Sequence, residues 1–199
     1  MYDFLLQMHG SFIVITYQRI LSMSQPIYLV VGTNRPNSAS KSFARYYQAY
    51  LQGLQQHVEI LDLADLPEDF AFSALYKNSG KNEVFNTFQT RIDAAEKFIF
   101  IVPEYNHSFP GVLKTFLDGL RYPDTFHGKK VALVGLSAGV IGNAVGLSHL
   151  NDILSYMGAD VLGLRLKLGQ FYQHFTENTL TNPVYQQFLE KQAAQFIRW

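Results

Sequence analysis

The chain has 199 residues, of which 48% are hydrophobic and 16% charged, a composition that excludes a disordered polypeptide. Lysine plus arginine equals aspartate plus glutamate at 16 each, so the net charge of zero gives no general attraction to nucleic acid. Cysteine is absent, which excludes disulfides, a thiolate nucleophile and iron–sulfur ligation.

Residues 1–24 match neither a signal peptide nor a membrane span. Their short apolar patches are interrupted by Asp3, Gln7 and Gly10, whereas a span needs about 20 apolar residues and a signal peptide needs a basic start and a cleavage site. We interpret them as an N-terminal extension outside the core, with Met23 as a candidate start. Residues 25–199 are predicted to form one domain, and the lack of cysteine favours the reducing cytoplasm.

The rest of the chain alternates between apolar runs and residues at helical spacing. The predicted strands cover 27–31, 58–63, 98–102, 130–136 and 159–164. The predicted helices carry apolar residues within 43–54, 84–95, 112–120, 147–157 and 184–189. Such alternation produces right-handed βαβ units. We therefore predict an α/β fold, a flavodoxin-like three-layer sandwich with a five-stranded parallel sheet of order 2-1-3-4-5.

The loop 32–40, between the first strand and the first helix, is rich in groups that bind anions. A helix start offers free N–H donors, and Thr33, Ser38 and Ser40 add hydroxyls while Arg35 adds a guanidinium. Together they could hold a phosphate monoester. The alternative is a plain turn, with Ser38 as helix cap and Arg35 in solvent. The loop matches neither Gly-rich nucleotide signature, so a nucleoside triphosphate is not expected.

The segment 103–111 leaves the third strand and opens the next helix. It offers polar groups at the carboxyl edge of the sheet, where ligands of open α/β folds bind. Tyr105 could line a planar ligand or serve the core or an interface. Glu104 lacks a partner carboxylate in the sequence, which favours a structural hydrogen bond over general acid catalysis. His107 is a single loop histidine, for which we assign no function.

The loop 137–142 follows the fourth strand and consists mainly of small residues. These allow either close approach of the backbone to a flat ligand or tight packing of a strand on a helix. In the predicted sheet, the first, third and fourth strands lie side by side, so the three loops converge on one crevice. A phosphate in the first loop with its ring between the other two fits flavin mononucleotide (FMN).

These loops resemble those of the NADPH-dependent FMN reductase family, which has a Gly-Ser-x-Arg loop and a Pro-Glu-Tyr-Asn-x-Ser-x-Pro-Gly-x-Leu-Lys segment. The matching residues are Gly32, Arg35, Ser38, Pro103, Glu104, Tyr105, Asn106, Ser108, Pro110, Gly111, Leu113 and Lys114. The resemblance runs from about residue 27 to 164. Thr33 replaces a common Ser, Ser40 a common Asn, and Asn143 a frequent Gly.

The resemblance implies two groups of cofactor-binding residues. The FMN phosphate would be bound by Thr33, Arg35, Ser38, Ala39 and Ser40, and the isoalloxazine edge would lie against Pro103, Glu104, Tyr105, Asn106, Ser137, Ala138 and Gly139. It also implies NADPH or NADH as electron donor and a homodimer or homotetramer. We assign no catalytic side chain and no metal site.

We expect an oxidoreductase that works by a ping-pong mechanism, because the flavin supplies the redox chemistry. Hydride would pass from NAD(P)H to bound FMN and the electrons on to a small acceptor, such as a quinone, an azo compound, a metal oxyanion or free flavin. The alternatives are a flavodoxin-like electron carrier, whose usual acidic face is not matched by a net charge of zero, and a flavin-binding sensor. No nucleic acid or membrane partner is expected.

Overall fold

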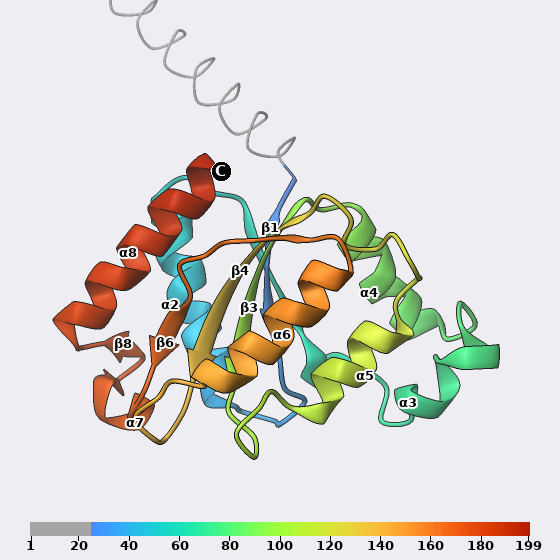
Figure 1. Cartoon of the computed structure of the whole chain (residues 1–199), viewed down its shortest axis with the longest axis horizontal. Helices are drawn as coiled ribbons and strands as arrows, with labels where there is room; N and C mark the ends of the chain where they lie inside the picture. The colour runs from blue at the N-terminus through green and yellow to red at the C-terminus, as the bar shows by residue number, and fades with distance from the viewer. Residues whose placement is uncertain (1–24) are drawn as a thin grey trace, which may run out of the picture.

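The computed structural model describes residues 25–199, and the predicted extension 1–24 lies outside this range. A parallel sheet forms its middle layer, in the order β2-β1-β3-β4-β5, which confirms the predicted topology (Figure 1). Its strands are β1 (Ile27–Val31), β2 (Val58–Asp62), β3 (Lys97–Pro103), β4 (Lys130–Leu136) and β5 (Asp160–Val161). The order reverses between β1 and β3, so this switch point opens a crevice at their carboxyl ends.

Helices cover both faces of the sheet. On one face lie α4 (Glu83–Asp93), α5 (Gly111–Gly119) and α6 (Ala144–Tyr156), and on the other α2 (Ala39–Gly53) and α8 (Pro183–Arg198). In Figure 1, α2 and α8 lie together on the left and α4 and α5 on the right. Residues 98–102 of β3 have no exposed surface, since a strand covered on both faces buries every side chain.

The fifth strand differs from the prediction of one continuous run over 159–164. The structure has two short pieces, β5 and β6 (Leu166–Leu168), which both pair with β4. Between them the carbonyl of Leu164 accepts a hydrogen bond from the side chain of Gln192, which also bonds the carbonyl of Leu133 in β4. The buried amide of α8 thus replaces ladder bonds and interrupts the strand.

Several short elements escaped prediction because they are shorter than the period that a hydrophobic pattern reveals. They are η1 (Leu63–Asp65), α3 (Phe70–Ser73), η2 (Tyr76–Asn78), α7 (Phe171–His174), β7 (Phe175–Thr176) and β8 (Thr179–Leu180). The last three follow β6, and β7 pairs with β8 in an antiparallel hairpin.

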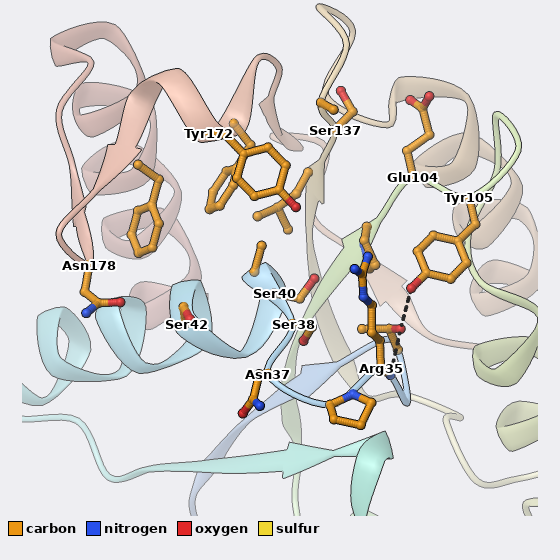
Figure 2. Close-up of a pocket in the computed structure, with 18 of the residues that line it drawn as sticks. Arg35, Asn37, Ser38, Ser40, Ser42, Glu104, Tyr105, Ser137, Tyr172 and Asn178 are labelled. Atoms are coloured by element: carbon orange, nitrogen blue, oxygen red, sulfur yellow. Dashed lines mark hydrogen bonds between the residues drawn. The ribbon is translucent and has the colours of Figure 1, made fainter.

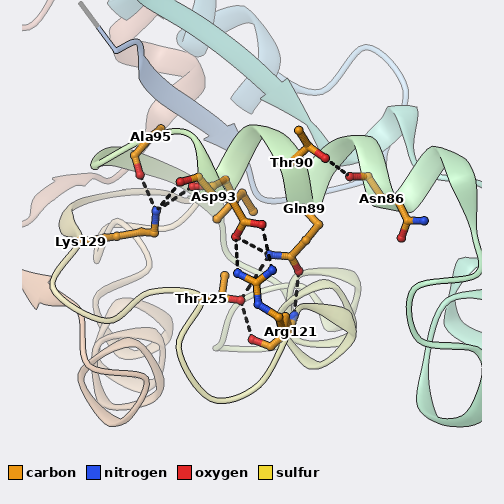
Figure 3. Close-up of polar contacts among 9 residues, drawn as sticks. Asn86, Gln89, Thr90, Asp93, Ala95, Arg121, Thr125 and Lys129 are labelled. Carbon is orange, nitrogen blue, oxygen red and sulfur yellow. Dashed lines mark hydrogen bonds and ion pairs between the residues drawn. The ribbon is translucent and has the colours of Figure 1, made fainter.

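Polar contacts fasten the loop between α5 and β4 onto α4 (Figure 3). The ammonium of Lys129 donates to the carbonyls of Ile92 and Ala95 at the carboxyl end of α4. Arg121 bonds both carboxylate oxygens of Asp93. Within residues 25–199, no helix combines the length and apolar character needed to cross a membrane.

Candidate functional site

A cavity of about 650 Å³ lies at the carboxyl ends of β1, β3 and β4, a volume typical of sites for small molecules and cofactors (Figure 2). The three predicted loops form much of its wall. Ten of the predicted residues line it, namely Thr33, Arg35, Ser38, Ala39, Ser40, Pro103, Glu104, Tyr105, Ser137 and Ala138. Asn106 and Gly139 do not.

The start of α2 presents unsatisfied donors to the cavity. The N–H groups of Ala39 and Ser40 precede the first hydrogen bonds of the helix, and Ser40 is 1% exposed, with a buried hydroxyl that has no hydrogen-bond partner. Ser38 does cap the helix, with its Oγ accepting from the Lys41 N–H at 3.2 Å. Ser38 therefore caps the helix, as the alternative of a plain turn expected, and the neighbouring donors stay free for a ligand.

The charge at this end of the cavity comes from Arg35. Its side chain is exposed, and its guanidinium forms no ion pair with any of residues 25–199. Lys41, on the first turn of α2, is held 2.7 Å from a carboxylate oxygen of Asp62. An unpaired guanidinium beside free helix N–H groups and a buried, unpartnered hydroxyl fits a phosphate group.

Thr33 connects the first loop to the second. Its buried hydroxyl accepts from the Arg35 N–H at 3.2 Å and lies 3.2 Å from the Tyr105 hydroxyl. Figure 2 shows this contact beside Arg35. The hydroxyl of Thr33 is therefore engaged by protein groups, and its expected part in binding phosphate stays a prediction.

The second loop turns back on itself after Tyr105. The backbones of Tyr105 and Ser108 exchange hydrogen bonds of 2.9 and 3.0 Å, and Asn106 and His107 between them have φ of 49° and 65°. Both are exposed at the tip of this tight turn, which accounts for the position of Asn106 outside the cavity. The Ser108 hydroxyl is held 2.9 Å from Nδ1 of His149 on α6.

Glu104 precedes the turn and extends the sheet. Its N–H donates to the carbonyl of Leu136 at 2.8 Å, so the pairing of β3 with β4 continues to the cavity. One carboxylate oxygen, Oε2, is buried without a hydrogen-bond partner. A buried acceptor of this kind is costly unless a donor completes it, so this end of the cavity fits a ligand that carries an N–H or O–H group.

The third loop shows the tight packing that was one of its two predicted alternatives. Ser137 Oγ donates to the carbonyl of Gly139 at 2.7 Å and accepts from the N–H of Gly142 at 2.9 Å, which fixes the loop. A Cβ on Gly142 would lie 2.5 Å from the carbonyl carbon of Lys167, so this glycine serves tight packing. The N–H groups of Ala138 and Gly139 donate to no acceptor within residues 25–199, and they leave this edge rich in donors.

Another wall of the cavity was not predicted from the sequence. It comes from the segment after β6 and from further residues at the start of α2, and includes Asn37, Ser42, Phe171, Tyr172, Phe175, Glu177 and Asn178. The available signal was the aromatic pair Phe171–Tyr172, shortly after the alternating stretch 164–168. The pair lies beyond the region of close resemblance, and nothing in its spacing indicates which way it folds.

Comparison with known proteins relates this chain to one family. The model of the NADPH-dependent FMN reductase family matches residues 26–173. A 2-hydroxy-1,4-benzoquinone reductase of Burkholderia sp. is 35% identical over 138 residues, which are 68% of this chain and 73% of the relative. An FMN-dependent NADPH-azoreductase of Staphylococcus saprophyticus is 32% identical over 129 residues, covering 63% and 67% of the two chains.

The fold also matches solved structures. The flavoenzyme NAD(P)H:(acceptor) oxidoreductase from Paracoccus denitrificans superposes with a TM-score of 0.72 at 24% identity, over 88% of this chain and 97% of the other. At that identity the match supports the flavodoxin-like fold alone. Because the family model covers most of the chain and includes all three loops of the cavity, the chain belongs to the NADPH-dependent FMN reductase family and is an oxidoreductase enzyme that uses FMN and a reduced nicotinamide cofactor.

Proposed function

We propose that FMN binds with its phosphate at the start of α2 and its isoalloxazine ring between the second and third loops. The observation that supports this most strongly is that one wall of the cavity carries two groups available to an anion. They are Arg35, which has no ion-pair partner in residues 25–199, and the buried, unpartnered hydroxyl of Ser40. A buried hydroxyl without a partner is costly in a protein without a ligand, and both groups are favourable beside a phosphate.

At the other end, the polar groups of the cavity would orient the ring. The free N–H of Ala138 suits an acceptor edge that gains negative charge on reduction, and the unpartnered oxygen of Glu104 suits a ring N–H. When bound, FMN supplies two-electron chemistry between a reduced nicotinamide and an acceptor. The chain's own part is to fix the cofactor and to leave one side of it open to both substrates in turn.

We further propose a ping-pong cycle with a small aromatic acceptor, a quinone or an azo compound. The names of two relatives, a benzoquinone reductase and an azoreductase, support this class. The aromatic wall at Tyr105 is consistent with flat substrates. No acid or base from the chain is required in this scheme, so Glu104 binds and orients without being a catalyst.

The experiment is a steady-state kinetic study of protein reconstituted with FMN. Initial rates of NADPH oxidation are measured at several concentrations of a benzoquinone. A ping-pong cycle gives parallel double-reciprocal lines, and intersecting lines would contradict it. Absence of turnover in a protein that binds FMN would instead favour an electron carrier or sensor.

The cytoplasm as compartment and a homodimer or homotetramer as assembly stay predictions. Cell fractionation tests the first and analytical ultracentrifugation the second. Loading with FMN should be compared between the assembled and dissociated protein, since family members commonly hold the flavin near a subunit interface.

A further inference from the structure

Tyr172, on α7, is an exposed tyrosine in the wall of the cavity outside the three predicted loops. Its side chain is 65% exposed, and its hydroxyl makes no hydrogen bond with any of residues 25–199. Figure 2 shows its ring at the side of the cavity above Ser38 and Ser40, with the hydroxyl directed inward. An exposed aromatic ring that lines a cavity adds little to the core and is available to a ligand.

The backbone around Tyr172 is held firmly despite the exposure of its side chain. The preceding residue, Phe171, is buried, with its ring stacked on Phe175 at 4.9 Å and edge-on to Phe43 of α2 at 6.0 Å. The N–H of Phe171 donates to the carbonyl of Ser137 at 3.0 Å. Tyr172 is thus anchored to the helix that begins at the phosphate end and to the third loop.

The two tyrosines of the cavity differ in the state of their hydroxyls. Tyr105 is engaged by Thr33 at 3.2 Å, whereas Tyr172 has no partner in residues 25–199. Tyr172 also stands on the same side as the unpartnered Ser40 hydroxyl. A hydroxyl without a protein partner gives up no hydrogen bond to the protein when a ligand arrives, and a hydrogen bond to an anion is stronger than one to a neutral group.

We propose that Tyr172 is an additional FMN-binding residue whose hydroxyl donates to the phosphate. This inference rests on the proposed FMN site and adds to it a residue that lies outside the three loops of the family resemblance. In this arrangement the phosphate is held from two directions, by α2 and Arg35 on one side and by α7 on the other. The segment after β6 would then contribute to retention of FMN in preference to flavins that lack a phosphate.

The test compares binding of FMN and riboflavin by the apoprotein, followed through the fluorescence of the flavin. Riboflavin shares the ring and the ribityl chain but lacks the phosphate. Tyr172→Phe removes only the hydroxyl, and Tyr76→Phe is the control because Tyr76 is 87% exposed and outside the cavity. Thermal unfolding of each apoprotein checks that the fold is unchanged.

We expect Tyr172→Phe to raise the Kd for FMN by about 5- to 30-fold, less than for a buried hydrogen bond to a charged group because Tyr172 is exposed, and to leave the Kd for riboflavin unchanged. Tyr76→Phe should change neither. An FMN Kd within about twofold of wild type, or equal weakening of FMN and riboflavin, would overturn the inference. Failure of the wild-type protein to bind FMN would instead contradict the proposed function itself.

Discussion

Arg35 offers the sharpest test of the phosphate end of the site. Its guanidinium has no ion-pair partner in residues 25–199, so Arg35→Ala should not change the free energy of unfolding of the apoprotein. A hydrogen bond between charged groups contributes about 1.5–3 kcal/mol. Because Arg35 is exposed to solvent, we expect about 1–2 kcal/mol, which corresponds to an increase of roughly 5- to 30-fold in the Kd for FMN.

The assay is equilibrium titration of FMN and riboflavin into wild-type and variant apoprotein, with urea unfolding run in parallel. Arg45→Ala is the matched control, since Arg45 lies on α2, is exposed and does not line the cavity. Arg35→Ala should weaken FMN alone, and the effect should shrink as salt is added. The reasoning is refuted if Arg35→Ala binds FMN as wild type does, or if Arg45→Ala weakens FMN equally.

Three further predictions concern stability, each measured by urea unfolding of the apoprotein. Gly142→Ala should lower the free energy of unfolding by about 2–4 kcal/mol, because φ is 58° and the new Cβ would lie 2.5 Å from the backbone of Lys167. The control Gly139→Ala, in the same loop, meets nothing within 4 Å and should be near neutral, so equal effects would contradict the packing argument. Gln192→Ala should lower the free energy of unfolding by about 2–4 kcal/mol, because it leaves the Tyr47 hydroxyl and the Leu164 carbonyl unpaired. Gln187 is exposed on the same helix, and a loss no larger than that of Gln187→Ala would contradict this prediction. Lys129→Met should cost about 1–2 kcal/mol by uncapping α4, and unchanged stability would show that water replaces the ammonium (Figure 3).

The order of the sheet could be predicted because its strands carry a direct signal. A strand covered on both faces is apolar throughout, as in residues 98–102, and helices at regular spacing separate the strands. The fifth strand could not be placed fully, because its interruption depends on a hydrogen bond from Gln192 to Leu164, a contact between residues far apart in sequence. Local pattern carries no information on such a contact.

The same limit applies to the site. The loops after β1, β3 and β4 could be predicted to meet, since adjacent parallel strands end at one edge. The contact of Thr33 with Tyr105 and the outward turn of Asn106 depend on side-chain and backbone geometry that residue types alone do not determine. Tyr172 was missed for a similar reason, since α7 is too short for a periodic pattern and is positioned by packing of Phe171 on Phe43.

The most direct test of the central claim is the visible absorption spectrum of the protein after incubation with FMN and removal of unbound flavin. The account predicts a flavin spectrum that remains with the protein, bleaches on anaerobic addition of NADPH and returns when a quinone is added. Flavin that separates entirely from the protein, together with no oxidation of NADPH or NADH, would contradict it.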